Sequence, residues 1–140
     1  MKFTLNEAKE FAEKKKIDKW AIKFLLETNN KNFANFVKNK GYWIGLNEIK
    51  LAKLNRRCGP EKEMKHREKL SIWNKRVNGM IKDIKTGWDV PPLIVWFLNN
   101  ELSIADGSHR LEALRKSGFN KYWVAIWFDK YEDYKQYSNL

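Results

Sequence analysis

Five adjacent residues, Asp106-Gly107-Ser108-His109-Arg110, combine side chains that together suit an anion. A glycine between a strand and a helix lets the backbone approach a ligand closely, and free amides at a helix start direct partial positive charge toward an anion. Ser108 adds a hydroxyl donor, while Arg110 adds a guanidinium that can contact two phosphate oxygens. We therefore predict a phosphate-type anion site at this turn.

Two side chains of the turn could also do chemistry. His109 could add a second positive or hydrogen-bonding contact to the anion. Asp106 could hold a Mg²⁺ ion or accept a substrate proton. These roles make the turn a candidate catalytic site as well as a binding site.

A local alternative explains the same residues without a ligand. Asp106 and Ser108 could cap the helix, Arg110 could pair with Glu112 or Glu101, and the histidine could lie on the surface. Short turn motifs also occur by chance. Spacing alone leaves both interpretations open.

The segments around the turn, residues 88–129, read as a strand, turn, helix and strand unit. Residues 93–97 and 102–105 are strand candidates joined by a hairpin turn at Asn99-Asn100. From Ser108 the pattern is helical and ends at Gly118. A buried strand over residues 122–128 follows.

The first forty residues are predicted to be helical. Thr4 and Glu7 form a capping-box pattern for a helix that runs to about Lys16. Asp18 is the predicted cap of a second helix that ends at Thr28. A third short helix contains Phe33, Phe36 and Val37 and ends near Lys40, with Gly41 as its left-handed cap.

The middle of the chain begins with a strand over residues 42–49. The residues after Pro60 look helical to about Lys85, since apolar residues from Leu70 to Ile84 recur at spacings of three and four. Gly87 closes this helix.

Composition favours one compact globular domain of 140 residues with 43% apolar residues. The longest apolar stretch, residues 90–98, is far shorter than the roughly 18 residues of a membrane span, so we expect no membrane insertion. The N-terminus has no hydrophobic leader, and the single cysteine, Cys58, cannot form an internal disulfide. We expect a cytoplasmic protein.

The formal net charge is +11, which suggests a polyanionic partner. Residues 91–140 carry six basic and six acidic side chains, so the excess lies outside the segment with the motif. Nucleic acid is therefore a candidate partner of the first 90 residues.

Three parts of the chain resemble the ParB and sulfiredoxin superfamily: residues 90–95, residues 102–114, and Gly118. Gly107 and Arg110 match the Gly-x-x-Arg turn of that group. The resemblance implies an α+β fold, a small mixed sheet with packed helices. Residues 1–40 would form a helical N-terminal extension, and residues 41–140 the ParB/sulfiredoxin-like domain. The resemblance also implies an anion or nucleotide bound at the turn. Our own expectation is ATP or another nucleotide, with Mg²⁺.

Members of that group differ in activity, so the fold alone does not fix function. Partition proteins bind DNA and hydrolyse CTP, sulfiredoxin uses ATP to repair an oxidised cysteine, and one branch is a free serine kinase. Ser108 stands where sulfiredoxin has its reactive cysteine, and Cys58 lies far away in sequence, so repair chemistry is not expected. The Asp-Gly-x-His-Arg form is most similar to the kinase-like branch.

That branch uses a glutamate base from a more N-terminal segment. The candidates are Glu48, Glu61 and Glu63, and we favour Glu61 because residues 56–61 resemble a loop held close to a site. Arg57 in this loop could contact phosphate. Each of these charges could equally be a solvated surface group.

The leading hypothesis is a nucleotide-binding enzyme that transfers or hydrolyses a phosphoryl group. Gly107, Ser108, His109, Arg110 and Arg57 would bind the nucleotide, Glu61, Asp106 and His109 would be catalytic, and Asp106 would hold Mg²⁺. The alternative is a DNA- or RNA-binding, nuclease-like module. Under either hypothesis, Arg110→Ala is expected to abolish anion binding and leave the fold intact. The sequence leaves the oligomeric state open.

Overall fold

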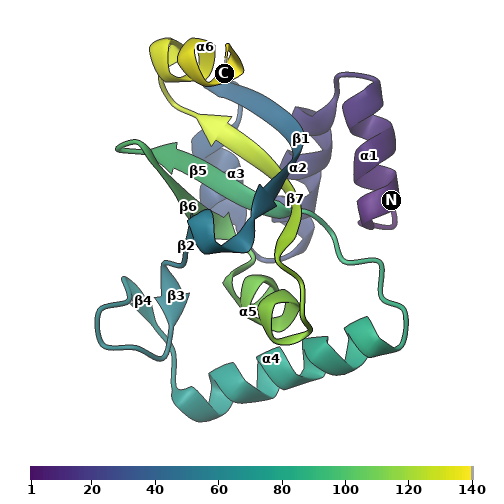
Figure 1. Cartoon of the computed structure of the whole chain (residues 1–140). Coiled ribbons are helices and arrows are strands. Elements are labelled where there is room, and N and C mark those ends of the chain that lie inside the picture. The colour runs from purple at the N-terminus through teal and green to yellow at the C-terminus, as the bar shows by residue number, and fades with distance from the viewer. Residues whose placement is uncertain (140) are drawn as a thin grey trace.

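The computed structural model describes residues 1–139, in which a five-stranded mixed sheet is surrounded by six α-helices (Figure 1). The strand order is β1 (Tyr42–Lys50), β7 (Lys121–Phe128), β5 (Leu93–Leu98), β6 (Glu101–Asp106) and β2 (Leu54–Asn55). The central pair β5 and β7 is parallel, each has an antiparallel neighbour, and β2 pairs parallel to β6. The predicted α+β fold with a small mixed sheet is confirmed.

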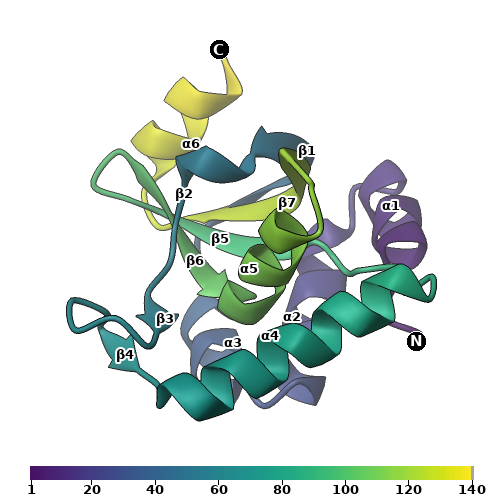
Figure 2. The same cartoon turned by 60° about the horizontal axis from the view of Figure 1, so that its bottom comes forward.

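Three N-terminal helices cover one face of the sheet: α1 (Leu5–Glu13), α2 (Ile17–Glu27) and α3 (Lys31–Val37) (Figures 1 and 2). Trp20 and Phe24 of α2 stack at a centroid distance of 4.9 Å and belong to the same core cluster as Ile94 and Ala125 of the sheet. The extension predicted for residues 1–40 is thus helical and shares this core. Its separation from residues 41–140 as a distinct part stays a prediction.

The ends of these helices differ from the sequence predictions. The first helix ends at Glu13, because Lys15 has a positive φ of 58° and the amide of Lys16 bonds back to Phe11. Lys16 is the N-cap of α2, so Asp18 lies inside the first turn and is not the cap. The α3 helix ends at Val37 with Lys38 as its cap.

Gly41 therefore does not cap α3, although its φ is positive, at 73°. Its conformation serves a close contact instead. A Cβ atom at this position would clash with the indole ring of Trp127, whose Nε1 donates to the carbonyl of Lys40 at 3.2 Å. The glycine allows the chain to pass over this ring as it enters β1.

The opposite face of the sheet is covered by α5 (Ser108–Lys116), which packs Leu111 and Leu114 against Leu93, Val124 and neighbouring side chains. Successive strand residues point to opposite faces, which explains why Leu93 and Ile94 enter different cores. The helix α4 (Leu70–Lys85) lies outside α5 (Figure 2).

The α4 helix forms a third, small core through Trp73 and Val77 with Ala113 of α5. The predicted close of this helix is confirmed, since Thr86 is the cap and Gly87 follows it with a φ of 98°. Its predicted start is wrong. The helix begins at Leu70 rather than just after Pro60.

The intervening residues fold back as two very short parallel strands, β3 (Cys58–Gly59) and β4 (His66–Arg67). The amide of His66 donates to Arg57 at 2.8 Å, and the amide of Glu68 donates to Gly59 at 2.9 Å. These backbone bonds, together with the Arg56–Glu61 ion pair, replace the helix that the Glu- and Lys-rich sequence favours locally.

The strand, turn, helix and strand unit is confirmed. Asn99 and Asn100 both have positive φ values, 53° and 62°, which is the geometry of a two-residue hairpin turn between β5 and β6. The β6 strand ends at Asp106, α5 begins at Ser108, and Gly118 follows that helix with a φ of 94°.

One further helix, α6 (Tyr131–Ser138), was not predicted from the sequence. It packs Tyr134 and Tyr137 against Phe128, at centroid distances of 5.9 and 5.4 Å. Its aromatic residues are spaced at three, which is a weak helical signal. Across residues 1–139, no helix has the length and apolar character that crossing a bilayer requires.

Candidate anion-binding site

The turn between β6 and α5 is built on Gly107. This residue is the N-cap of α5, has a φ of 117° and offers no side chain to cap the helix. A Cβ atom here would lie 2.9 Å from Leu93 Cδ2 and from Arg110 Nη2. The helix therefore starts without a side-chain cap, which leaves its first amides suited to an external acceptor.

Arg110 is buried beneath this turn. Its Nη1 donates to the carbonyls of Pro91 and Pro92 at 2.8 and 2.7 Å, and its Nη2 donates to Asp106 Oδ2 at 2.8 Å. Burial lowers the pKa of the guanidinium, and the neighbouring carboxylate of Asp106 opposes that shift. Arg110 thus joins the turn to the start of β5.

This geometry bears on two expectations about Arg110. Its carboxylate partner is Asp106, so the alternative pairing with Glu112 or Glu101 is wrong. The expectation that Arg110→Ala leaves the fold intact does not agree with a side chain that is 5% exposed and makes four internal hydrogen bonds. Its contact with phosphate stays a prediction.

Asp106 is held from two sides. Oδ1 accepts from Asn30 Nδ2 at 3.1 Å and Oδ2 accepts from Arg110. A role for Asp106 as Mg²⁺ ligand or proton acceptor stays a prediction, and it requires at least one of these bonds to be exchanged.

His109 points toward α4. Its Nε2 lies 2.9 Å from Glu68 Oε1, and its ring packs on Trp73 at a centroid distance of 4.6 Å. Glu68 in turn pairs with Arg76 at 3.3 Å. His109 is thus a half-buried group with a carboxylate partner, rather than a free surface side chain.

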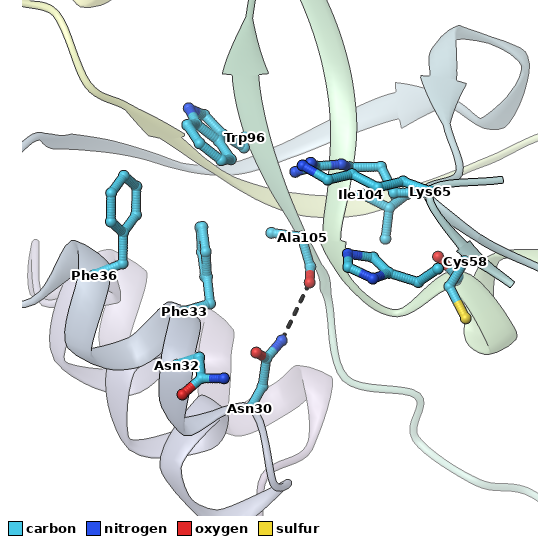
Figure 3. A pocket seen from close by; sticks show the side chains of 12 residues that line it. Asn30, Asn32, Phe33, Phe36, Cys58, Lys65, Trp96, Ile104 and Ala105 are labelled. Atoms are coloured by element: carbon cyan, nitrogen blue, oxygen red, sulfur yellow. Dashed lines mark hydrogen bonds between the residues drawn. The ribbon is translucent and has the colours of Figure 1, made fainter.

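A cavity of about 420 Å³ lies on one side of the turn (Figure 3). We call it the aromatic-basic pocket. It is lined by the aromatic residues Phe33, Phe36 and Trp96, by the basic or titratable residues Arg57, Lys65 and His66, and by Asn30, Asn32, Cys58, Ile104, Ala105 and Ser108.

The pocket has two chemically different sides. In Figure 3 the labelled aromatic side chains gather on one side, while Lys65 and Cys58 lie on the other. Phe36 and Trp96 are 5.3 Å apart between ring centroids, and the guanidinium carbon of Arg57 lies 5.7 Å from the Trp96 ring centroid. Asn30 fixes the edge near the turn by donating to the carbonyl of Ala105 at 3.1 Å.

A second cavity, of about 360 Å³, lies on the other side of the turn. It is lined by the turn residues Asp106, Gly107, His109 and Arg110, and otherwise by Phe3, Phe24, Thr28, Met80, Trp88 and Pro91. The guanidinium that lines this cavity, that of Arg110, is already paired with Asp106. The aromatic-basic pocket, which Ser108 lines, therefore offers an anion more available positive charge.

The five turn residues thus do not face a single cavity. Of the predicted nucleotide-binding residues, Ser108 and Arg57 line the aromatic-basic pocket, whereas Gly107, His109 and Arg110 line the second cavity. The turn forms the boundary between the two.

The three candidate base glutamates line neither cavity. Glu61 Oε1 is bound to Arg56 Nη2 at 2.6 Å. Burial raises the pKa of this carboxyl, but the hydrogen bond from Arg56, a backbone hydrogen bond and the charge of Arg56 together outweigh burial, so the pKa is lowered. Glu48 of β1 pairs with Lys121 of β7 at 3.3 Å, and Glu63 is exposed. The base role of Glu61 stays a prediction.

Several residues of the site carry no local signal in the sequence. Phe33 and Phe36 read as a helix core, Trp96 as a buried strand residue, and His66 as an isolated histidine. Glu68, the carboxylate that does reach the turn, was not among the candidates. The folding of residues 58–68 brings His66 and Glu68 to the motif, whereas the packing of α3 beside β5 brings Phe33 and Phe36 to Trp96.

Comparisons with known proteins find similarity in structure. No protein-family model matches the chain, and no curated protein matches its sequence. Sulfiredoxin from Arabidopsis thaliana is similar with a TM-score of 0.47 and 20% identity, over 69% of this chain and 100% of that chain. A free serine kinase in complex with AMP is similar with a TM-score of 0.45 and 18% identity, over 62% of this chain.

The partitioning protein ParB from Caulobacter crescentus, truncated and complexed with CTP-gamma-S, is similar with a TM-score of 0.42 and 16% identity, over 59% of this chain. The alignments span 32% of the kinase chain and 44% of the ParB chain. Sulfiredoxin, a free serine kinase and ParB are also the proteins named in the resemblance that the sequence suggested, and all three similarities have TM-scores below 0.5.

Proposed function

We propose that this protein binds a nucleotide in the aromatic-basic pocket, with the phosphates toward Ser108 and the start of α5. The observation that carries the proposal is the composition of this one cavity, which joins an aromatic side to a basic side next to a helix that lacks a side-chain cap. Its volume of about 420 Å³ lies within the usual range of small-molecule sites, roughly 300–1,000 Å³.

The aromatic side suits the base of a nucleotide. Phe33 and Phe36 rise from α3 toward Trp96, and a planar base has a face that stacks on such rings (Figure 3). Stacking on aromatic side chains contributes about 1–3 kcal/mol per base and does not depend on which base is present. The pocket therefore predicts affinity for nucleotides over inorganic phosphate.

The basic side suits the phosphates. Arg57 and Lys65 line the pocket, and neither is paired with a carboxylate in residues 1–139. Ser108 adds a hydroxyl at the first position of α5, where the helix dipole also favours negative charge. A guanidinium can contact two phosphate oxygens at once.

The finer activity we propose is Mg²⁺-dependent transfer or hydrolysis of the terminal phosphoryl group, with ATP as the first nucleotide to test. Mg²⁺ commonly binds through nucleotide phosphates and one or two carboxylates, so Asp106, which adjoins Gly107, is the carboxylate of the turn that fits. Asp106 and His109 line the second cavity, so this activity requires the terminal phosphate to extend from the aromatic-basic pocket past the Gly107 turn. His109, with Glu68 as its partner, would exchange protons near the reacting group. Such chemistry depends mainly on positioning and charge neutralisation.

Nucleic acid is the second candidate ligand, because the net charge is +11 and stacking pockets also hold single-stranded bases. Affinity for a duplex falls with log salt at a slope of about −0.9 per neutralised phosphate. A compact nucleotide site should respond less steeply, so salt separates the two ligands.

The experiment is a thermal-shift screen of ATP, ADP, CTP and GTP with and without Mg²⁺, beside adenosine, inorganic pyrophosphate, a short duplex and a single strand. A ligand at a hundred times its dissociation constant stabilises the fold by roughly 2.7 kcal/mol. We expect a larger shift with nucleotides than with adenosine or pyrophosphate, reduced in Arg57→Ala.

The matched control is Arg67→Ala, which removes the same charge from β4, beside the segment of Arg57, at a residue that does not line the pocket. If the thermal shift caused by nucleotides falls equally in both variants, the nucleotide is bound by nonspecific charge attraction to a basic protein. A shift with DNA alone that high salt removes would favour the nucleic-acid ligand.

A further inference from the structure

Three metal-ligating side chains meet beside the aromatic-basic pocket. Cys58 comes from β3, Glu68 from the segment that leads into α4, and His109 from the first turn of α5. One donor atom from each, a sulfur, an oxygen and a nitrogen, lies within 4.8 Å of the other two. Residues distant in the sequence thus converge at one point.

The three groups are held in place by further contacts. His109 lies against the ring of Trp73 and makes its 2.9 Å contact with Glu68, which also pairs with Arg76. The backbone of Cys58 is fixed by the pairing of β3 with β4, and Arg56 Nη1 donates to its carbonyl at 3.4 Å. All three residues are half-buried.

We propose that Cys58, Glu68 and His109 form a binding site for a divalent cation of the zinc type. Thiolate, imidazole and carboxylate are the ligands that zinc takes in proteins, at about 2.0–2.3 Å. Ligands of a tetrahedral zinc ion lie roughly 3.5 Å apart by that geometry. Movements of about 1 Å within three side chains would bring the present donors to that spacing.

The charges of the site agree with such an ion. A thiolate and a carboxylate together supply two negative charges, and the imidazole binds in its neutral form. On binding, the Cys58 thiol forms its bond to the metal as its proton leaves to solvent.

Three protein ligands leave one position of a tetrahedral ion for water or another ligand. Cys58 lines the aromatic-basic pocket, while its sulfur points away from the aromatic rings in Figure 3. The ion would therefore lie at the edge of the pocket, on the side of α5. This site differs from the proposed Mg²⁺ position at Asp106 in both its donors and its metal. A cation bound here would take His109 and Glu68 as ligands, so the proton exchange proposed for His109 belongs to the protein without this cation.

The test is a titration of the purified protein with Co²⁺, followed by competition with Zn²⁺, without any nucleotide. The chain has one cysteine, so a thiolate-to-cobalt charge-transfer band can come only from Cys58. We expect this band to appear with one equivalent of Co²⁺, to disappear with Zn²⁺, and to be absent in Cys58→Ser.

His109→Gln and Glu68→Gln should each weaken metal binding by more than the roughly tenfold to hundredfold that loss of an outer hydrogen-bond partner costs a metal site. The matched control is His66→Gln, which removes the other histidine, an exposed residue of β4. No band in the wild type, or a band weakened equally by His66→Gln, would overturn the proposal.

A second measurement needs no variant. The rate at which iodoacetamide alkylates Cys58 in the wild type should fall at least tenfold when Zn²⁺ is added, because a metal-bound thiolate is protected. An unchanged alkylation rate at saturating Zn²⁺ would contradict the site even if a variant failed to fold.

Discussion

Arg110 and Asp106 form an ion pair across the Gly107 turn, with Nη2 of Arg110 2.8 Å from Oδ2 of Asp106. The guanidinium is almost fully buried, and its other nitrogen is bound to two carbonyls of the segment that precedes β5. The pair therefore links three parts of the fold: the end of β6, the start of α5 and the entry to β5.

We predict that Arg110→Ala lowers the free energy of unfolding by about 3–5 kcal/mol, because it leaves a carboxylate and two carbonyls without their donor. Urea denaturation measures this change. Arg115→Ala is the control on the same helix, since Arg115 is half-exposed and its nearest carboxylate, Glu112, is 3.9 Å away. Equal denaturation midpoints for the two variants would contradict the structural role of Arg110.

Gly107 provides a second test of the turn. Its φ of 117° and the 2.9 Å approach of Leu93 and Arg110 predict that Gly107→Ala costs about 1–3 kcal/mol of stability. Gly79→Ala is the matched control, because Gly79 lies within α4 and a Cβ there meets nothing within 4 Å. Gly79→Ala should instead raise the free energy of unfolding by roughly 0.5–1 kcal/mol. An equal loss of stability in both variants would contradict the claim that the turn requires a glycine at position 107.

Tyr122 predicts how stability depends on alkaline pH. Its hydroxyl donates to the carbonyl of Val90 at 2.6 Å, and burial, followed by the charge of Asp89, raises its pKa from 10.0 to about 12. The folded state thus retains a proton that the unfolded chain loses first. This contribution to stability is complete below about pH 10 and is lost as the pH rises toward about 12.

Between these pH values the free energy of unfolding of the wild type should therefore fall by up to about 3 kcal/mol. Tyr122→Phe should not show this fall. At about pH 8 the variant should be less stable than the wild type by roughly 1 kcal/mol, the value of the missing hydrogen bond. Urea denaturation of both proteins across this pH range measures the difference. Parallel stability curves for the two would show that Tyr122 does not titrate as its surroundings require.

The aromatic side of the pocket makes a prediction about affinity. Phe36→Ala should weaken ATP binding about tenfold, as the loss of one stacking contact predicts. Phe119→Ala is the control, since Phe36 and Phe119 are both phenylalanines with 39% exposure and only Phe36 lines the pocket. Titration calorimetry measures the two affinities. An equal loss in both variants, or in neither, would argue against stacking on Phe36.

The unit around the turn could be predicted from sequence because its signals are local. The two asparagines at positions 99 and 100 and the glycines at 107 and 118 all adopt positive φ angles where the hairpin and helix ends require them. The α5 helix and the flanking strands follow the periodicity of their apolar residues. These features depend on neighbours along the chain.

Residues 61–69 could not be predicted in this way. Their glutamates and lysines favour a helix, but the chain folds as a loop because backbone bonds to Arg57 and Gly59 and the ion pair of Glu61 with Arg56 hold it. A helix there would carry Lys65 and His66 away from the pocket. Tertiary contacts determine this segment, and no local pattern records them.

The candidate site shows the same limit. The motif identifies Ser108 and His109, but the partner of His109 is Glu68, 41 residues earlier in the chain. The rings of Phe33 and Trp96, 6.0 Å apart, come from a helix and a strand on different parts of the sequence. Which residues meet across a pocket depends on the topology of the fold, and local sequence patterns do not predict such long-range contacts.

The most direct test of the proposed function is a map of amide and indole NMR shifts during a titration with ATP, and in a second sample with CTP. If the nucleotide binds in the aromatic-basic pocket, saturating shifts will concentrate there, at Arg57, Lys65 and Ser108 and at the indole N–H of Trp96. Shifts that concentrate instead in the second cavity, that spread without saturation over the exposed lysines, or that do not occur would contradict it.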